Sequence, residues 1–215
     1  MPVEHRLITA KPCRVASSDE TTRMGNVVGS LKEVQHQIVV GTLLGDGSMR
    51  CKTNALLEIN HSAKQRGYVD WKYRQLADLV TTPPQERRGN GGRIAYRFVT
   101  RSLPCLTPYY RLFYANGRKF VGELELAPLT LAVWFMDDGC RSRTAVYLNT
   151  QQFDRPSQEA LLCQLREQWG IEGALNRDKQ YHRIRLTVDG TQRLARLVRP
   201  YLLDELSYKL PQMTP

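Results

Sequence analysis

Cysteine and histidine are scarce in this chain of 215 residues, and neither is spaced as in a zinc site or a disulfide framework. No two cysteines form a Cys-x-x-Cys pair, and their number is odd; they are Cys13, Cys51, Cys105, Cys140 and Cys163. The histidines are scattered and are expected to be structural or ligand-facing rather than zinc-binding; they are His5, His36, His61 and His182. These features predict a reducing, intracellular setting.

Long apolar runs are also missing, and acidic residues are few. No stretch is long enough to span a membrane, and residues 1–30 lack the apolar core of a signal peptide, so we expect a tail or arm there. Lysine and arginine together number 31 against 21 acidic residues, which gives a net charge of +10 and an isoelectric point near 9.6. A polyanion is therefore the expected partner, and nucleic acid is the leading candidate.

The most informative pattern present is a motif that occurs twice. Residues 39–47 read VVGTLLGDG and residues 131–139 read LAVWFMDDG, so each is an apolar run that ends in Asp-Gly. The spacing predicts helices over 31–44 and 128–137, and Gly41 and Gly45 would let the two axes approach closely. If the helices pack in parallel, Asp46 and Asp138 lie side by side. Adjacent carboxylates on a basic protein indicate divalent metal and phosphodiester chemistry.

The segments behind each motif follow the same order. A hairpin is predicted near 48–61 and 141–150, then a helix at 67–80 and 157–169, then strands that include 93–100 and 181–188, then a further helix. Lys119 and Lys209 each follow their motif aspartate by about 70 residues. The pattern predicts an α-β-β-α-β-β-α course in each of two halves, residues 31–125 and 126–215, behind a tail at 1–30.

These residues resemble the LAGLIDADG homing endonuclease family, and most closely its branch with a second motif of the form Trp-x-Met-Asp-Asp-Gly, here Trp134 to Gly139. The resemblance covers roughly residues 31–212. It implies an α+β fold with pseudo-twofold symmetry. Two antiparallel sheets would form a saddle for DNA around a central pair of motif helices.

The resemblance also implies a site. Asp46 and Asp138 would be metal ligands, assisted by the backbone carbonyls of Gly45 and Asp137, and Lys119 and Lys209 match the family's active-site lysines. The implied cofactor is Mg²⁺ or Mn²⁺, with Ca²⁺ binding without supporting cleavage. Val133 and Asp137 occupy the second-motif positions of Gly41 and Gly45, so the helix interface should be asymmetric. The Asp137 side chain is expected either to support the site or to be only a helix C-terminal acid.

Several residues have more than one interpretation at this stage. Asp46 and Asp138 could be ordinary helix-end turn residues, although the repetition favours a site. Lys119 and Lys209 could stabilise developing charge, position water or merely contact phosphate. His61 and Gln151 could order water, and His61 could equally be a packing or DNA contact residue.

Alternating strands indicate sheets with one apolar face and one face suited to reading the major groove. Arginine pairs with guanine, Asn or Gln with adenine, and Glu58 could accept from cytosine. The expected readers are Asn54, Glu58, Asn60, Arg93, Arg97, Arg143, Tyr147, Asn149, Tyr181, Arg183, Arg185 and Thr187. Arg50, Lys52 and Arg141 are expected to contact phosphates.

Three functions remain open from the sequence. The first is a monomeric, metal-dependent endonuclease that cuts double-stranded DNA at a long asymmetric site. The second is an RNA-binding maturase that acts on intron RNA, and the third is a regulator that binds DNA without cleaving it. Intact Asp46 and Asp138 disfavour the third, and a C-terminal Gln-Met-Thr-Pro disfavours protein splicing.

Overall fold

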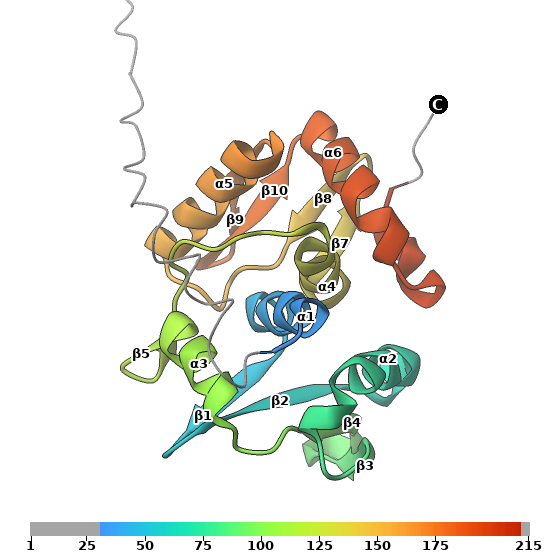
Figure 1. Ribbon diagram of the computed structural model, residues 1–215. Helices are drawn as coiled ribbons and strands as arrows, with labels where there is room; N and C mark the ends of the chain where they lie inside the picture. The colour runs from blue at the N-terminus through green and yellow to red at the C-terminus, as the bar shows by residue number, and fades with distance from the viewer. Residues whose placement is uncertain (1–30, 212–215) are drawn as a thin grey trace, which may run out of the picture. The chain divides into compact units, whose positions relative to one another are not determined.

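Two apolar helices, one from each motif, lie side by side at the centre of the fold (Figure 1). The computed structural model describes residues 31–211; the predicted tail, with His5 and Cys13, lies outside the described residues. Helix α1 spans Glu33–Leu44 and helix α4 spans Pro128–Asp138. Both are buried along most of their length: α4 along nearly all of it, and α1 mainly over Ile38–Leu44, where its sequence is largely apolar. Proline at the start of α4 is favoured because the first helical turn leaves its N–H groups unpaired.

Each central helix opens one half with the same course of elements. In the first half they are β1 (Ser48–Cys51), β2 (Ala55–Ser62), α2 (Arg66–Leu76), β3 (Gln85–Arg88), β4 (Ile94–Val99) and α3 (Thr107–Phe113), followed by the small hairpin β5 (Tyr114–Ala115) and β6 (Arg118–Lys119). In the second half they are β7 (Gly139–Ser142), β8 (Ala145–Leu148), α5 (Arg155–Trp169), β9 (Gly173–Asp178), β10 (Tyr181–Leu186) and α6 (Val188–Val198). Short 3₁₀ turns join these elements, and the last, Asp204–Lys209, carries Lys209.

The two sheets have the same topology. Each is four-stranded and antiparallel, with the order β1-β2-β4-β3 in the first half and β7-β8-β10-β9 in the second. Figure 1 shows the first sheet on one side of the α1–α4 pair and the second sheet on the other. The predicted fold class is therefore confirmed. No helix among residues 31–211 is long and apolar enough to cross a membrane.

One predicted strand is too long at its C-terminal end. Strand β10 ends at Leu186, and Thr187 is instead the N-cap of α6, where its hydroxyl accepts the Gly190 N–H at 3.0 Å. The expectation that Thr187 shares the polar sheet face with Arg185 is therefore wrong. Threonine favours this position because its oxygen satisfies an amide that the first helical turn leaves unpaired.

The interface between α1 and α4 pairs glycine on one helix with a larger residue on the other. A Cβ atom at Gly41 would lie 2.6 Å from the Thr130 carbonyl oxygen and 2.8 Å from Val133 Cβ. A Cβ atom at Gly45 would lie 2.4 Å from Asp137 Cβ. Val133 and Asp137 thus fill the space that the two glycines leave, and the predicted asymmetry of the interface is confirmed.

We expect Gly41→Ala to destabilise the protein by about 1–2 kcal/mol. Alanine gains about 1 kcal/mol of helix propensity, but the added methyl meets a backbone oxygen that cannot rotate away, and overpacking costs roughly 1–3 kcal/mol. Urea unfolding measures the change. The control is Gly122→Ala, since a Cβ there meets nothing within 4 Å. A Gly41→Ala protein as stable as the control would contradict close contact between the helices.

Candidate active site and nucleic-acid interface

The two motif aspartates lie where α1 and α4 end. Asp46 follows the C-cap residue of α1, and Asp138 is the last residue of α4. The Asp46 side chain is 49% exposed, whereas Asp138 is half-buried. Burial, together with the negative charges of Asp46 and Asp137, raises the pKa of Asp138 to about 8. The helix pair therefore concentrates carboxylates that lack full compensation by positive charge.

A lysine from each half binds the carbonyls at these helix ends. Lys119 Nζ, on β6, donates to the carbonyl oxygens of Leu43 (2.9 Å), Gly45 (3.2 Å) and Gly47 (2.6 Å). Lys209 Nζ donates to the carbonyls of Met136 and Asp137, the latter at 2.9 Å. Burial lowers the pKa of both ammonium groups, that of Lys119 to about 8. Each lysine thus satisfies carbonyls that a helix end leaves unpaired and brings positive charge to the site.

Gln152 reaches the site, and its neighbour Gln151 does not. Gln152 Nε2 donates to the Leu44 (3.0 Å) and Gly45 (3.1 Å) carbonyls and to Asp138 Oδ2 (3.3 Å). Gln151 Nε2 donates to Asp178 Oδ2 at 3.0 Å. Gln151 is therefore bonded to Asp178 and makes none of these contacts, and it is Gln152 that contacts the helix ends and Asp138. Both residues lie in the turn after β8, where strand alternation no longer indicates which side chain faces inward.

His61 both packs in the interior and lies beside the aspartates, two interpretations that the sequence left open. It is buried on β2, and its ring packs against Tyr68 with the centroids 5.3 Å apart. Its Nδ1 lies 3.6 Å from Asp46 Oδ2, and its Nε2 lies 3.7 Å from Asp137 Oδ1. Burial and the charge of Lys72 lower the pKa of His61, which favours the neutral imidazole.

The Asp137 side chain points into the first half and forms a buried ion pair there. Its two oxygens lie 2.9 and 3.0 Å from Lys72 Nζ on α2, and both side chains are 0% exposed. Asp137 Oδ2 also accepts the backbone N–H of Asp46 at 3.3 Å. Asp137 is therefore not merely a helix C-terminal acid. Sequence reasoning missed Lys72 because a lysine on an amphipathic helix ordinarily faces solvent.

The donors present fit a hard divalent cation. The Asp46 and Asp138 carboxylates and the Gly45 and Asp137 carbonyls are oxygen ligands, which Mg²⁺, Mn²⁺ and Ca²⁺ prefer. Burial and the charges of Asp46 and Asp137 raise the pKa of Asp138, and a bound cation would act in the opposite direction by favouring its carboxylate form. His61 and the Asp137 carboxylate also offer atoms within 4.8 Å of an Asp46 oxygen and of each other, but Lys72 already neutralises Asp137.

On the outer face of the first sheet, one glutamate forms ion pairs with two of the arginines that were predicted to contact DNA. Glu58, on β2, bonds Arg50 on β1 and Arg97 on β4, each at 3.0 Å. The Glu58 carboxylate is thus occupied by arginines, which disfavours the cytosine contact predicted for it. Asn60 is exposed on the same face, opposite Arg97. Arg93 lies just before β4, and Asn54 and Lys52 lie in the turn after β1.

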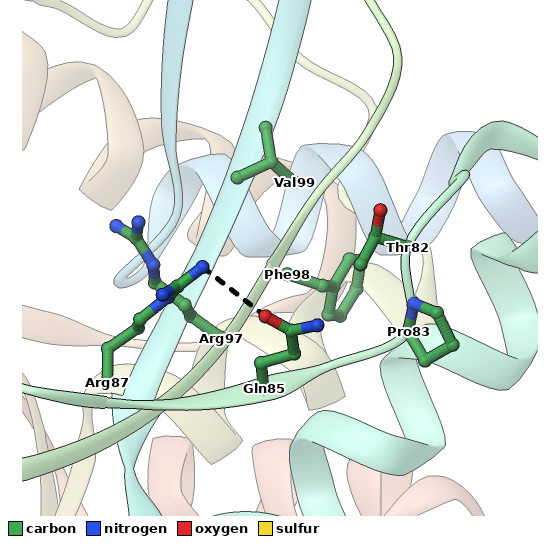
Figure 2. A pocket seen from close by; sticks show the side chains of 7 residues that line it. All are labelled: Thr82, Pro83, Gln85, Arg87, Arg97, Phe98 and Val99. Atoms are coloured by element: carbon green, nitrogen blue, oxygen red, sulfur yellow. Dashed lines mark hydrogen bonds between the residues drawn. The ribbon is translucent and has the colours of Figure 1, made fainter.

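A pocket lies beside Arg97 at the β3 edge of this sheet. Figure 2 shows Arg87, Gln85 and Arg97 around it, with Thr82 and Pro83 at one side and Phe98 and Val99 completing the lining. Arg87 donates to the Gln85 side-chain oxygen at 3.3 Å. Two of the side chains that line the pocket carry guanidinium groups, which suits contact with a polyanion.

The outer face of the second sheet holds its arginine through an aromatic ring. The Arg183 guanidinium lies 4.1 Å from the Tyr147 ring centroid, and its NH1 lies 3.4 Å from Asn149 Oδ1. Arg183 Nε is buried without a hydrogen-bond partner. Arg185 pairs across the strands with Tyr147 and is exposed, as is Tyr181. The structure thus brings these residues to one face.

Two further predicted DNA contacts lie at the β7–β8 hairpin. Arg141 is exposed on β7, in keeping with a phosphate contact. Arg143 is in the turn with a φ of 53° rather than on a strand, so its predicted place on the sheet face is wrong. A turn position displaces its side chain from the alternation on which base reading was predicted.

Sequence comparisons place the chain among known proteins. A profile described as the LAGLIDADG DNA endonuclease family matches residues 36–194. The RecA protein of Mycolicibacterium chitae is 28% identical over 204 residues, which cover 84% of this chain and 47% of the relative, so the chain spans about half that relative's length. The probable intron-encoded endonuclease 1 of Wickerhamomyces canadensis is 26% identical over 197 residues, covering 84% and 85%. The cytochrome b mRNA maturase bI2 of Debaryomyces hansenii is 26% identical over 190 residues, covering 81% and 72%.

Solved structures agree with the fold. The homing endonuclease I-WcaI bound to its DNA recognition sequence matches with a TM-score of 0.79 at 22% identity, covering 96% of this chain and 97% of that one. I-DmoI in complex with DNA and Mn matches with a TM-score of 0.53 at 10% identity, covering 79% and 98%. At these identities the likeness concerns the fold, which is the predicted two-sheet saddle of tandem halves.

We expect Asp138→Asn to stabilise the metal-free protein at alkaline pH. The folded-state pKa is about 8 against an ordinary value of 3.8, so the folded state holds this proton more tightly. The stability that this bound proton contributes to the folded state is fully present below about pH 4. It is lost as the pH rises through the folded-state pKa of about 8. In EDTA, urea unfolding should find the variant about 1–3 kcal/mol more stable than wild type at pH 8. The two should be nearly equal at pH 4.5.

The control for this experiment is Asp189→Asn, which removes an exposed acid paired with Arg193 on α6. An exposed pair contributes about 0–1 kcal/mol, so this variant should be no more stable than wild type at either pH. An Asp138→Asn protein that is less stable than wild type at pH 8 would show that the carboxylate cluster is not under electrostatic strain.

Proposed function

The chain belongs to the LAGLIDADG DNA endonuclease family, and we propose that it is a site-specific endonuclease that cuts both strands of DNA with a divalent metal. The observation that carries this proposal is the meeting of Asp46 and Asp138 at the ends of two packed helices, between two sheets with arginine-bearing outer faces. A regulator of the same fold that binds DNA without cleaving it would not need this pair of carboxylates.

The chain's own residues supply the metal site and the charge around it. Asp46, Asp138 and the carbonyls of Gly45 and Asp137 would hold Mg²⁺ or Mn²⁺, whereas Ca²⁺ would bind without supporting cleavage. A bound metal supplies an activated water and neutralises charge on the phosphate and the leaving oxygen. Lys119 and Lys209 hold the ligand carbonyls in place and add positive charge close to the phosphate that reacts. Gln152 orients Asp138 through its amide.

The two sheets would lie along the duplex. Basic side chains bring the protein to the phosphates, and the arginines of the outer faces reach base edges. One chain contains both motif helices, so we propose that it acts as a monomer. The polar faces of the halves differ in sequence, which favours a target that is asymmetric. The I-WcaI and I-DmoI structures, solved with DNA and the latter with Mn, support a DNA partner and a divalent cation for this fold.

A maturase function is the second candidate. The cytochrome b mRNA maturase bI2 is as similar in sequence as the intron-encoded endonuclease, so binding of intron RNA could accompany cleavage or replace it. The deciding experiment incubates the protein with a randomised duplex DNA library and Mg²⁺ and sequences the cut ends. One long recurrent site supports the endonuclease. Absence of cutting, with tight binding to the host intron RNA, supports the maturase.

We expect Asp46→Asn and Asp138→Asn each to abolish double-strand cleavage of the selected site while leaving DNA affinity within about threefold. Each substitution removes a proposed metal ligand and leaves the outer faces of both sheets unchanged. Because the lost charge is negative, its removal should not weaken binding to DNA phosphates. Cleavage is read on labelled duplex with Mg²⁺, and binding on the same duplex with Ca²⁺. The exposed Asp189→Asn variant is the matched control and should cut normally. Wild-type cleavage rates in both motif variants would exclude the proposed site.

We expect Arg185→Ala and Lys52→Ala to weaken binding in different ways. Arg185 is exposed on the β10 face, and if it reads a base edge its loss should cost about 1–3 kcal/mol and relax preference at one or two base pairs. Lys52 lies in the turn after β1, and its loss should weaken all sequences alike and lower the salt slope by about one.

Arg183→Ala completes this series. Its guanidinium is held on Tyr147, so the direction in which it presents its hydrogen bonds is fixed before DNA binds. Affinities for a panel of single base-pair substitutions provide the readout. An unchanged preference in both arginine variants would show that these side chains position the duplex without reading it.

A further inference from the structure

The two motif aspartates have unlike surroundings. The backbone N–H of Asp46 donates to Asp137 Oδ2, and His61 lies 3.6 Å from the Asp46 carboxylate. Asp138 instead contacts Gln152, through its side chain. In the first motif the position of Asp137 is taken by Gly45, so no side chain can reach across from α1 toward Asp138 in the same way.

The contact from Asp137 fixes one particular peptide group. The N–H of Asp46 and the carbonyl of Gly45 belong to the same peptide bond, which is planar. Asp137 binds its N–H side, while Lys119 and Gln152 bind its carbonyl side. This peptide carries one proposed metal donor, and the next atom along the chain carries the Asp46 carboxylate. Its orientation therefore sets the direction of two donors at once.

Lys72 in turn holds Asp137, and Tyr68 packs against Lys72. Lys72 binds both Asp137 oxygens, and its Nζ lies 4.5 Å from the centroid of the Tyr68 ring. The Tyr68 hydroxyl donates to the Val133 carbonyl on α4 at 3.2 Å. Two side chains of α2, in the first half, thus bind the C-terminal end of α4, in the second half. Because Gly45 has no side chain, the Asp137 side chain can occupy the space beside it.

We propose that Asp46 and Asp138 each serve the cutting of one DNA strand, and that Asp137, held by Lys72, is a positioning residue for Asp46 that makes these two centres unequal. This inference rests on the proposed nuclease function. The centre served by Asp46 depends on Asp137, Lys72 and the adjacent His61. Asp138 is contacted by Gln152, which also binds the Gly45 carbonyl, and Lys72 does not bind it. One strand of the target should therefore be sensitive to the pair, and the other strand should not.

The test measures the cutting rate of each strand separately, on a duplex with both strands labelled, under single-turnover conditions with Mg²⁺. Lys72→Met alone would leave a buried unpaired carboxylate and could unfold the protein, since breaking a buried pair costs about 3–5 kcal/mol. The double variant Lys72→Met/Asp137→Asn removes both charges and retains similar volumes. His61→Phe retains an aromatic ring against Tyr68 and removes the polar atoms near Asp46.

We expect both variants to slow one strand by at least tenfold, the same strand in each, while the other strand stays within threefold of wild type. Nicked product should then accumulate, and DNA affinity in Ca²⁺ should be unchanged. The matched control is Lys32→Met/Asp78→Asn, which removes an exposed ion pair of 3.1 Å at the far end of α1. It should slow neither strand.

Equal slowing of both strands, or no slowing in folded variants, would overturn the proposal, because either result is what a purely structural pair predicts. If the double variant does not fold, the strand bias of His61→Phe decides the question. Failure of the proposed function is separate and visible in the wild type, which would then cut neither strand.

Discussion

The close approach of α1 and α4 is the constraint from which the rest of the site follows. Gly41 and Gly45 lack side chains, so the backbone of α1 can lie against Thr130, Val133 and Asp137 of α4. A wider separation would part the helix ends and, with them, Asp46 and Asp138. Both sheets depend on the same contact, since each is joined to its own central helix and the helices join the halves. One interface thus serves both the hydrophobic core and the carboxylate pair.

That contact also creates an electrostatic problem that the chain solves with lysines. Helix C-termini are negatively polarised, and here two of them meet beside three aspartates. Lys72 neutralises Asp137 directly, whereas Lys119 and Lys209 bind carbonyls and leave the carboxylates of Asp46 and Asp138 free of a lysine contact. Burial and, after it, the negative charges of Asp46 and Asp137 raise the pKa of Asp138. The lysines thus satisfy the carbonyls at the helix ends but leave the two carboxylates without a bound positive charge, as expected for a cation site.

The sequence was sufficient to predict the repeated order of elements, the central helices and the unequal interface, because each depends on local periodicity or on residue size. Gln152 could not be distinguished from Gln151, since both follow the end of a strand and alternation no longer applies. Lys72 could not be identified because its partner lies 65 residues away in the other half. Thr187 was misplaced because threonine suits both a strand and a helix N-cap, and only tertiary packing decides between them. The roles of the site residues, as distinct from their places, stay predictions.

The two halves share a topology but hold their outward arginines by different physics. In the first sheet Glu58 lies between Arg50 and Arg97, so these side chains are oriented by a carboxylate that also lowers the local positive charge. In the second sheet Tyr147 lies beneath Arg183, so orientation comes from a ring face and the full positive charge remains. The two halves therefore share a strand order, while their outer faces differ in charge and in the groups that hold the arginines. That divergence matches the one at the centre, where Asp137 faces Gly45, so the asymmetry of the molecule extends from the helix pair to both sheets.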